Sequence, residues 1–80
     1  MPTMVRLEKI RISDKMAEAD FFPEDSKVCG HVKVDLNTGE YAETVSVDGY
    51  DLGYANHAAR ELVRISKEGE IPESRIVMWY

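Results

Sequence analysis

The segment "VCGHVKVDLNTGEYAETVSVD" (residues 28–48) contains the clearest strand signal in the chain, so the fold is predicted from it first. Residues 28–36 alternate apolar or small side chains with polar ones, as a strand with one buried face does. The residues expected to face inward are Val28, Gly30, Val32, Val34 and Leu36.

A hairpin should follow this strand, because Asn37 and Gly39 are residue types that accept tight or left-handed turns. Residues 41–48 then return as a second strand, with Val45 and Val47 pointing inward.

The register of the hairpin depends on the length of its loop. A three-residue loop would set Val32 opposite Thr44, whereas a four-residue loop would set it opposite Val45. We favour the second pairing, because it gathers the valines on one face.

Met4–Ser13 precedes the hairpin and also has the composition of a strand. Its alternation changes phase, because Val5 and Leu7 share one face and the two isoleucines that follow share the other. A bulge near Glu8 and Lys9 would reconcile the two halves.

The segment between these strands is ambiguous. Ser13 is a good helix cap and a helix would end before Pro23, so we expect either a short helix over residues 14–21 or a loop. Phe21 and Phe22 should close one edge of the core.

Residues 54–68 are predicted to form one long amphipathic helix, ended by Gly69 and Pro72. Its apolar or small face comprises Ala55, Ala58, Ala59, Leu62, Val63 and Ser66. The alanines would let the helix lie close to the sheet.

The last segment, "SRIVMWY" (residues 74–80), is a strand without a polar face. Val77 and Trp79 share one face, whereas Ile76, Met78 and Tyr80 share the other. Either the segment 14–27 covers that second face, or the face is a protein contact, commonly in a symmetric dimer.

These elements predict one α+β domain over residues 1–80, with a four-stranded, mostly antiparallel sheet and one helix on one face. If residues 14–21 are helical, the order becomes a split βαβ arrangement (βαββαβ), a topology shared by many unrelated domains.

Composition narrows the class of protein. The chain has 80 residues, 44% of them hydrophobic and 31% charged, which fits a small folded domain with a thin core. A net charge of −5 disfavours nucleic acid and membrane surfaces as partners. Cys29 is the one cysteine, so no internal disulfide can form. We therefore expect a soluble, cytoplasmic protein.

Cys29 and His31 are the first candidates for chemistry, because they stand two apart on a strand and would point to one face. An imidazole can activate a nearby thiol, but a zinc site needs three or four ligands, and this pair supplies two.

The loop after Asp35 lacks the glycine and glutamate of a calcium loop, and the common phosphate-loop and hydrolase motifs are absent. No metal, cofactor or catalytic residue is therefore predicted.

A second candidate lies where the hairpin meets the long helix. A ligand corner there would use Tyr50, Tyr54, His57 and Arg60. The competing interpretation is a packed corner, with His57 on the water-facing side of the helix, paired to Glu61, which also reaches Arg64.

We expect a small interaction or regulatory module that associates with itself through its C-terminal strand, using Ile76, Met78, Trp79 and Tyr80. The alternative is a small enzyme or ligand-binding domain built on Cys29 and His31 or on the tyrosine corner. A third hypothesis, an acidic decoy for a nucleic-acid-binding protein, rests on the net charge alone.

Overall fold

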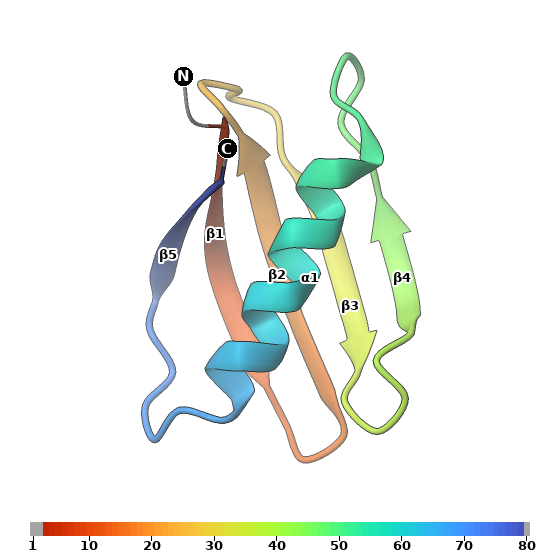
Figure 1. Cartoon of the computed structure of the whole chain (residues 1–80), viewed down its shortest axis with the longest axis vertical. Coiled ribbons are helices and arrows are strands. Elements are labelled where there is room, and N and C mark those ends of the chain that lie inside the picture. The colour runs from red at the N-terminus through yellow and green to blue at the C-terminus, as the bar shows by residue number, and fades with distance from the viewer. Residues whose placement is uncertain (1–2, 80) are drawn as a thin grey trace.

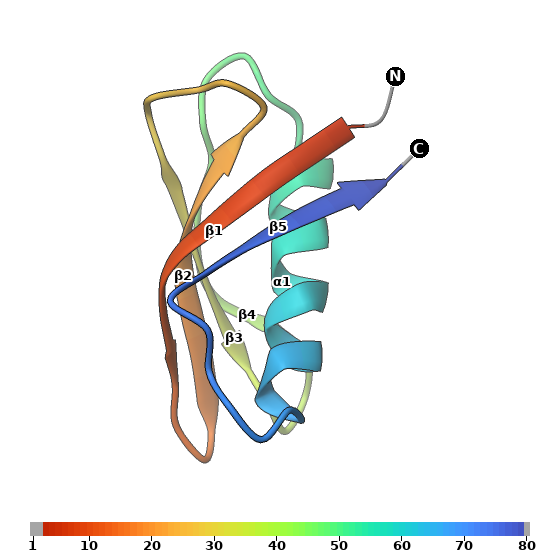
Figure 2. The same cartoon turned by 90° about the vertical axis from the view of Figure 1, so that its left-hand side faces the viewer.

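Five antiparallel strands and one helix form a two-layer α+β structure in the computed structural model, which describes residues 3–79 (Figure 1). The elements are β1 (Thr3–Ile12), β2 (Met16–Pro23), β3 (Gly30–Asp35), β4 (Tyr41–Val45), α1 (Leu52–Ser66) and β5 (Ser74–Trp79). The strand order is β4-β3-β2-β1-β5, and α1 covers one face of the sheet (Figures 1 and 2). The α+β class is confirmed, but the prediction of four strands is one strand short.

The missing strand is β2, and the predicted short helix over residues 14–21 is wrong. Its buried side chains fall at every second position from Ala17 to Pro23, which is the period of a strand. β2 lies between β1 and β3, so both of its edges are paired. The order is therefore ββββαβ, and the split βαβ alternative is excluded.

The expected bulge in β1 is confirmed. The pairing of β1 with β2 shifts between Glu8 and Arg11, and Lys9 has a φ of 54°. One extra residue in β1 reverses the alternation. As a result, Ile10 and Ile12 pack against the same core as the residues before the bulge.

The hairpin is confirmed, but its favoured register is wrong. Val32 lies opposite Thr44, and Val45 lies opposite His31 with 50% of its surface exposed. The turn sets this register, because the Asp35 carboxylate accepts the backbone N–H groups of the two residues that follow Leu36. α1 leaves β4 exposed, so gathering the valines would have buried little.

α1 begins two residues earlier and ends two residues earlier than predicted. Asp51 caps it by accepting the N–H of Gly53 at 2.8 Å, and Lys67 forms the C-terminal cap. Ala55, Ala58 and Ala59 are buried against the sheet, as expected. Small side chains at these positions allow a close approach of helix to sheet.

The core lies between α1 and one face of the sheet. Its buried members are Val5, Leu7, Ala17, Ala19, Phe21, Val32, Val34, Val47, Ala55, Ala58, Ala59, Leu62 and Ile65. Phe21 is central to this core, whereas Phe22 points to the other face, where the Arg6 guanidinium lies 4.7 Å from its ring centre. The two phenylalanines therefore do not close one edge together, as was predicted.

The sheet face opposite α1, called the uncovered face below, bears no other element among residues 3–79. Across it, Arg11 lies opposite Glu18, Glu18 opposite Lys33, and Lys33 opposite Glu43. Alternating charges in directly opposed positions stabilise neighbouring strands and keep this part of the face hydrated. Over β1 to β4 it is thus an ordinary water-facing surface.

Candidate interaction surface

β5 forms one edge of the sheet. It pairs with β1 from Thr3 opposite Trp79 to Glu8 opposite Ser74, and within residues 3–79 no strand lies on its other side. Figure 2 looks at the molecule from this side, with β5 and the loop before it facing the viewer. The outer edge of β5 is therefore open to another strand.

The hydrogen-bonding groups on this edge can be assigned from β1. The carbonyl of Met4 accepts the N–H of Glu24, so the groups of Met4 point towards β2. These groups alternate in direction along a strand, so those of Val5 point towards its partner Val77 in β5. It follows that the N–H and C=O groups of Ile76 and Met78 point away from the sheet.

The side chains of β5 divide between the two faces as predicted. Val77 and Trp79 are partly buried on the side of α1, whereas Ile76 and Met78 lie on the uncovered face and are 56% and 58% exposed. Met4 lies opposite Met78 and extends this apolar area. We call Met4, Ile76 and Met78 the edge patch. Tyr80, the fourth predicted interface residue, lies outside the described residues.

The segment 14–27 does not cover the edge patch, which corrects one of the two explanations for the apolar strand. Residues 16–23 form β2, separated from β5 by β1. A segment that is part of the sheet cannot also cover the second face of its edge strand. The apolar second face of β5 consequently remains exposed.

Trp79 is held by aromatic contacts to α1. The His57 ring stacks on Trp79 with ring centres 3.8 Å apart and 14° between the planes. Tyr54 meets Trp79 edge-on at 5.5 Å, and Tyr50 meets Tyr54 edge-on at 5.3 Å. The prediction that His57 simply faces water is therefore wrong, because packing of β5 beside α1 gives its ring an aromatic partner.

Tyr54 also connects the helix to the first strand. Its hydroxyl donates to Glu24 at 2.8 Å, and the same carboxylate oxygen accepts the N–H of Met4 at 3.0 Å. The hydrogen bond to Glu24 is the main reason that the pKa of Tyr54 rises to about 12. The raised pKa favours the protonated hydroxyl, which is the donor in this hydrogen bond.

The predicted ligand corner is only partly assembled. Tyr50, Tyr54 and His57 lie in one aromatic chain with Trp79, but their contacts are to one another and to neighbouring strands. Arg60 is exposed and lines two shallow grooves, one beside Tyr41 and the other beside Trp79. The arrangement is typical of a packed corner.

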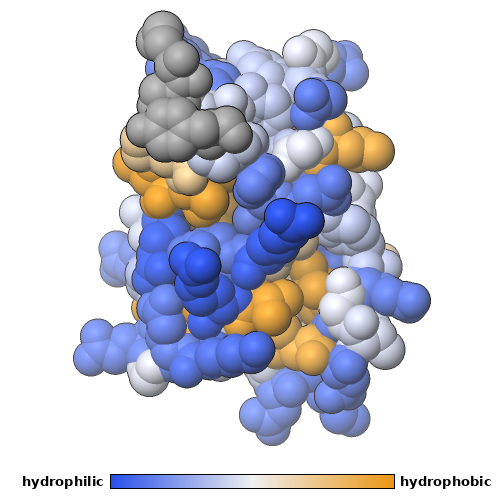
Figure 3. Space-filling view, viewed as in Figure 1, coloured by the Kyte–Doolittle hydropathy of each residue, from blue (hydrophilic) through white to orange (hydrophobic). Residues whose placement is uncertain are grey.

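The surface around α1 is mixed in character. Figure 3 shows hydrophilic surface along much of the helix, with apolar surface on both sides of it. The groove on the β5 side is lined by His57, Arg60, Glu61, Arg64, Val77, Met78 and Trp79. It brings residues of the predicted ligand corner beside residues of the predicted interface.

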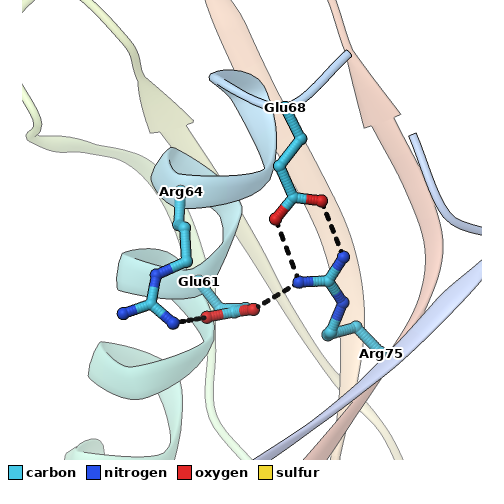
Figure 4. Close-up of polar contacts among 4 residues, drawn as sticks. All are labelled: Glu61, Arg64, Glu68 and Arg75. Atoms are coloured by element: carbon cyan, nitrogen blue, oxygen red, sulfur yellow. Dashed lines mark hydrogen bonds and ion pairs between the residues drawn. The ribbon is translucent and has the colours of Figure 1, made fainter. Parts of the chain in front are cut away.

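An ion-pair cluster connects β5 to the C-terminal half of α1 and to Glu68, which lies just after the helix (Figure 4). Arg75 donates to Glu61 at 2.8 Å and to both oxygens of Glu68. Glu61 is 8% exposed and also contacts Arg64 at 3.4 Å. The hydrogen bonds from Arg75 lower the pKa of the Glu68 carboxyl, which favours its charged form.

This cluster corrects the prediction for Glu61. The expected contact with Arg64 is present, but no contact with His57 is found among residues 3–79. Glu61 is a buried link to Arg75 instead of a surface residue paired along the helix. Sequence periodicity alone could not place Arg75 beside it, because the two residues belong to different elements.

Cys29 and His31 are not brought together as a site. Cys29 is exposed and precedes β3, whereas the Nδ1 atom of His31 lies 2.9 Å from the Asp20 carboxylate in β2. Asp20 can orient the imidazole, but no contact joins it to a thiol or hydroxyl in the described part of the chain. His31 therefore lies on the uncovered face, paired with Asp20 of the neighbouring strand.

The described residues contain neither a metal-binding cluster nor a membrane-spanning helix. Within residues 3–79, no three His, Cys, Asp or Glu side chains stand close enough together to hold a metal ion. No helix in the same range is long and apolar enough to cross a membrane.

Fold and surface together define a small α+β domain whose edge strand β5 exposes apolar side chains. Comparison with protein-family models, curated proteins and solved structures gives no match for this chain.

Proposed function

We propose that this protein is an interaction module that associates with itself through the outer edge of β5. The observation that carries the proposal is that Ile76 and Met78 combine an open backbone edge with exposed apolar side chains. Addition of a strand to such an edge satisfies backbone groups and buries side chains in one step.

β5 lacks the features that usually protect an edge strand. It contains no proline, and its one charged residue, Arg75, is bound to the carboxylates of Glu61 and Glu68. By contrast, β4 at the opposite edge carries Glu43, and its pairing with β3 is irregular between Lys33 and Val34. The apolar edge is therefore the more suitable one for a partner.

A second copy of the chain is the occupant that fits this edge best. Two identical strands can pair antiparallel about a two-fold axis, and each then offers the other the same alternation of side chains. The edge patch would form one continuous apolar strip across both copies. Regulatory action would follow if self-association controls access to the groove beside Trp79.

Ile76→Glu should abolish association, because it removes an apolar side chain from the edge patch and brings a negative charge from each copy to the joined edge. Sedimentation velocity over a range of chain concentrations measures this directly. We expect the wild type to shift from monomer towards dimer as concentration rises, and Ile76→Glu to remain a monomer.

Val28→Glu is the matched control, because Val28 is 65% exposed and lies outside the strands. It should associate as the wild type does. A wild type that remains monomeric at every concentration, or an Ile76→Glu variant that associates equally well, would refute the proposal. Circular dichroism of each variant verifies that the fold is retained.

A further inference from the structure

We infer that the two β5 strands pair with Val77 directly opposite Val77 of the second copy, an inference that rests on the proposed function. The proposal concerns the register of the interface, and therefore which residues meet across it. Two properties of β5 support it, namely the division of its side chains between two faces and the position of its one charge. The direction of its backbone groups is compatible with it.

The two-fold axis restricts the registers. For antiparallel strands in one continuous sheet, this axis stands perpendicular to the sheet, so both copies present the same face to the same side. A residue on the uncovered face can then oppose only a residue on that face. The pairing must therefore be centred on a residue, and Arg75, Ile76, Val77 and Met78 are the candidates within β5.

Charge and polarity distinguish these registers. Centring on Arg75 would set two guanidinium groups opposite each other, and directly opposed like charges destabilise a sheet. Centring on Ile76 would set Ser74 opposite Met78, a polar residue against an apolar one. Centring on Met78 would shorten the overlap within β5, because only the residue after Met78 remains to pair.

Centring on Val77 avoids each of these costs. Ile76 then lies opposite Met78 of the second copy, and Met78 opposite Ile76, so the edge patches join. On the side of α1, Arg75 lies opposite Trp79 of the second copy, so the aliphatic stem of Arg75 packs beside that ring while its guanidinium stays bound to Glu61 and Glu68. Every apolar side chain from Ile76 to Trp79 meets an apolar or aromatic partner or the stem of Arg75.

The backbone is compatible with this register. The outward-pointing groups belong to Ile76 and Met78, and this register pairs these two residues with each other in both directions. Each such pair exchanges two hydrogen bonds, so the outward N–H and C=O groups of both residues are satisfied. Val77 then forms a pair without mutual hydrogen bonds, the type in which opposed Cα atoms approach most closely.

The helix does not obstruct this pairing. α1 packs mainly over β1, β2 and β3, and the edge of β5 lies to one side of it (Figure 1). In the joined sheet, both helices would lie on the same side, separated by the two copies of β5.

Disulfide trapping tests the register. In a Cys29→Ser background, Val77→Cys should form a disulfide-linked dimer on mild oxidation, because opposed residues of this pair type have the spacing that a disulfide requires. Ile76→Cys alone should cross-link poorly, whereas a mixture of Ile76→Cys and Met78→Cys chains should form the mixed dimer. Gel electrophoresis without reductant and sedimentation are the readouts.

The mixed pair covers the case in which Val77→Cys fails to fold, since Ile76 and Met78 are more than half exposed. Preferential cross-linking of Ile76→Cys to itself would overturn the register but leave the proposed function intact. Association without cross-linking at any of these positions would also overturn it. Monomeric behaviour of the Cys29→Ser parent would instead refute the proposed function.

Discussion

Gly30→Ala should destabilise the fold by about 3 kcal/mol, at the upper end of the usual cost of overpacking a core. A Cβ atom on Gly30 would collide with the carbonyl oxygen of Val45 and with the Phe21 ring, whose Cε1 atom would lie 2.7 Å away. The clash with Val45 involves backbone, so it cannot be relieved by a change of rotamer. Urea unfolding, followed by circular dichroism at low chain concentration, measures the loss.

Gly69→Ala is the matched control, because nothing lies within 4 Å of a Cβ at Gly69. Its stability should stay within about 0.5 kcal/mol of the wild type. Adding Phe21→Leu to Gly30→Ala should restore only part of the loss, since the clash with the carbonyl persists. Equal stability of the two alanine variants would show that β3 does not pass Phe21 and β4 as closely as described.

Leu62→Ala should cost about 3 kcal/mol, within the range for removal of a buried leucine side chain. Leu62 has no exposed surface and packs on the inner face of α1. Its truncation leaves a cavity between helix and sheet in a domain whose core is small. The same unfolding measurement applies.

Leu52→Ala provides the comparison on the same helix. Leu52 is 61% exposed in the first turn, so its truncation should change stability by less than about 0.5 kcal/mol. Similar losses for the two leucines would contradict the orientation of α1 on the sheet.

The parts of the fold that follow from local pattern could be predicted. The bulge near Lys9 could be predicted, because the alternation of four apolar residues reverses within one strand. One inserted residue is the simplest way to restore a single buried face. The inward alanines of α1 were visible for the same reason, since helical periodicity is local.

β2 could not be predicted from helix propensity and capping. Its alanines and acidic residues favour helix, and Ser13 is a good cap, so local propensity and alternation disagreed. The strand is favoured because β2 lies between β1 and β3. There both of its edges are hydrogen-bonded and every second side chain is buried. The alternation of Ala17, Ala19 and Phe21 was the signal that could have identified it.

The candidate surface was predicted in part. The absence of a polar face in "IVMWY" identified the residues, but the edge position of β5 depends on strand order, which periodicity does not encode. Met4 joined the patch only through its pairing with Met78. The contacts of His57 with Trp79 and of Glu61 with Arg75 likewise depend on β5 lying beside α1.

Amide hydrogen exchange in β5, measured by NMR at low and high chain concentration, tests the central claim most directly. We predict that the amides of Ile76 and Met78 exchange rapidly in the monomer and become protected as concentration rises. The amide of Val77, which points towards β1, should be protected at both concentrations. Rapid exchange of Ile76 and Met78 at every concentration would contradict self-association through this edge.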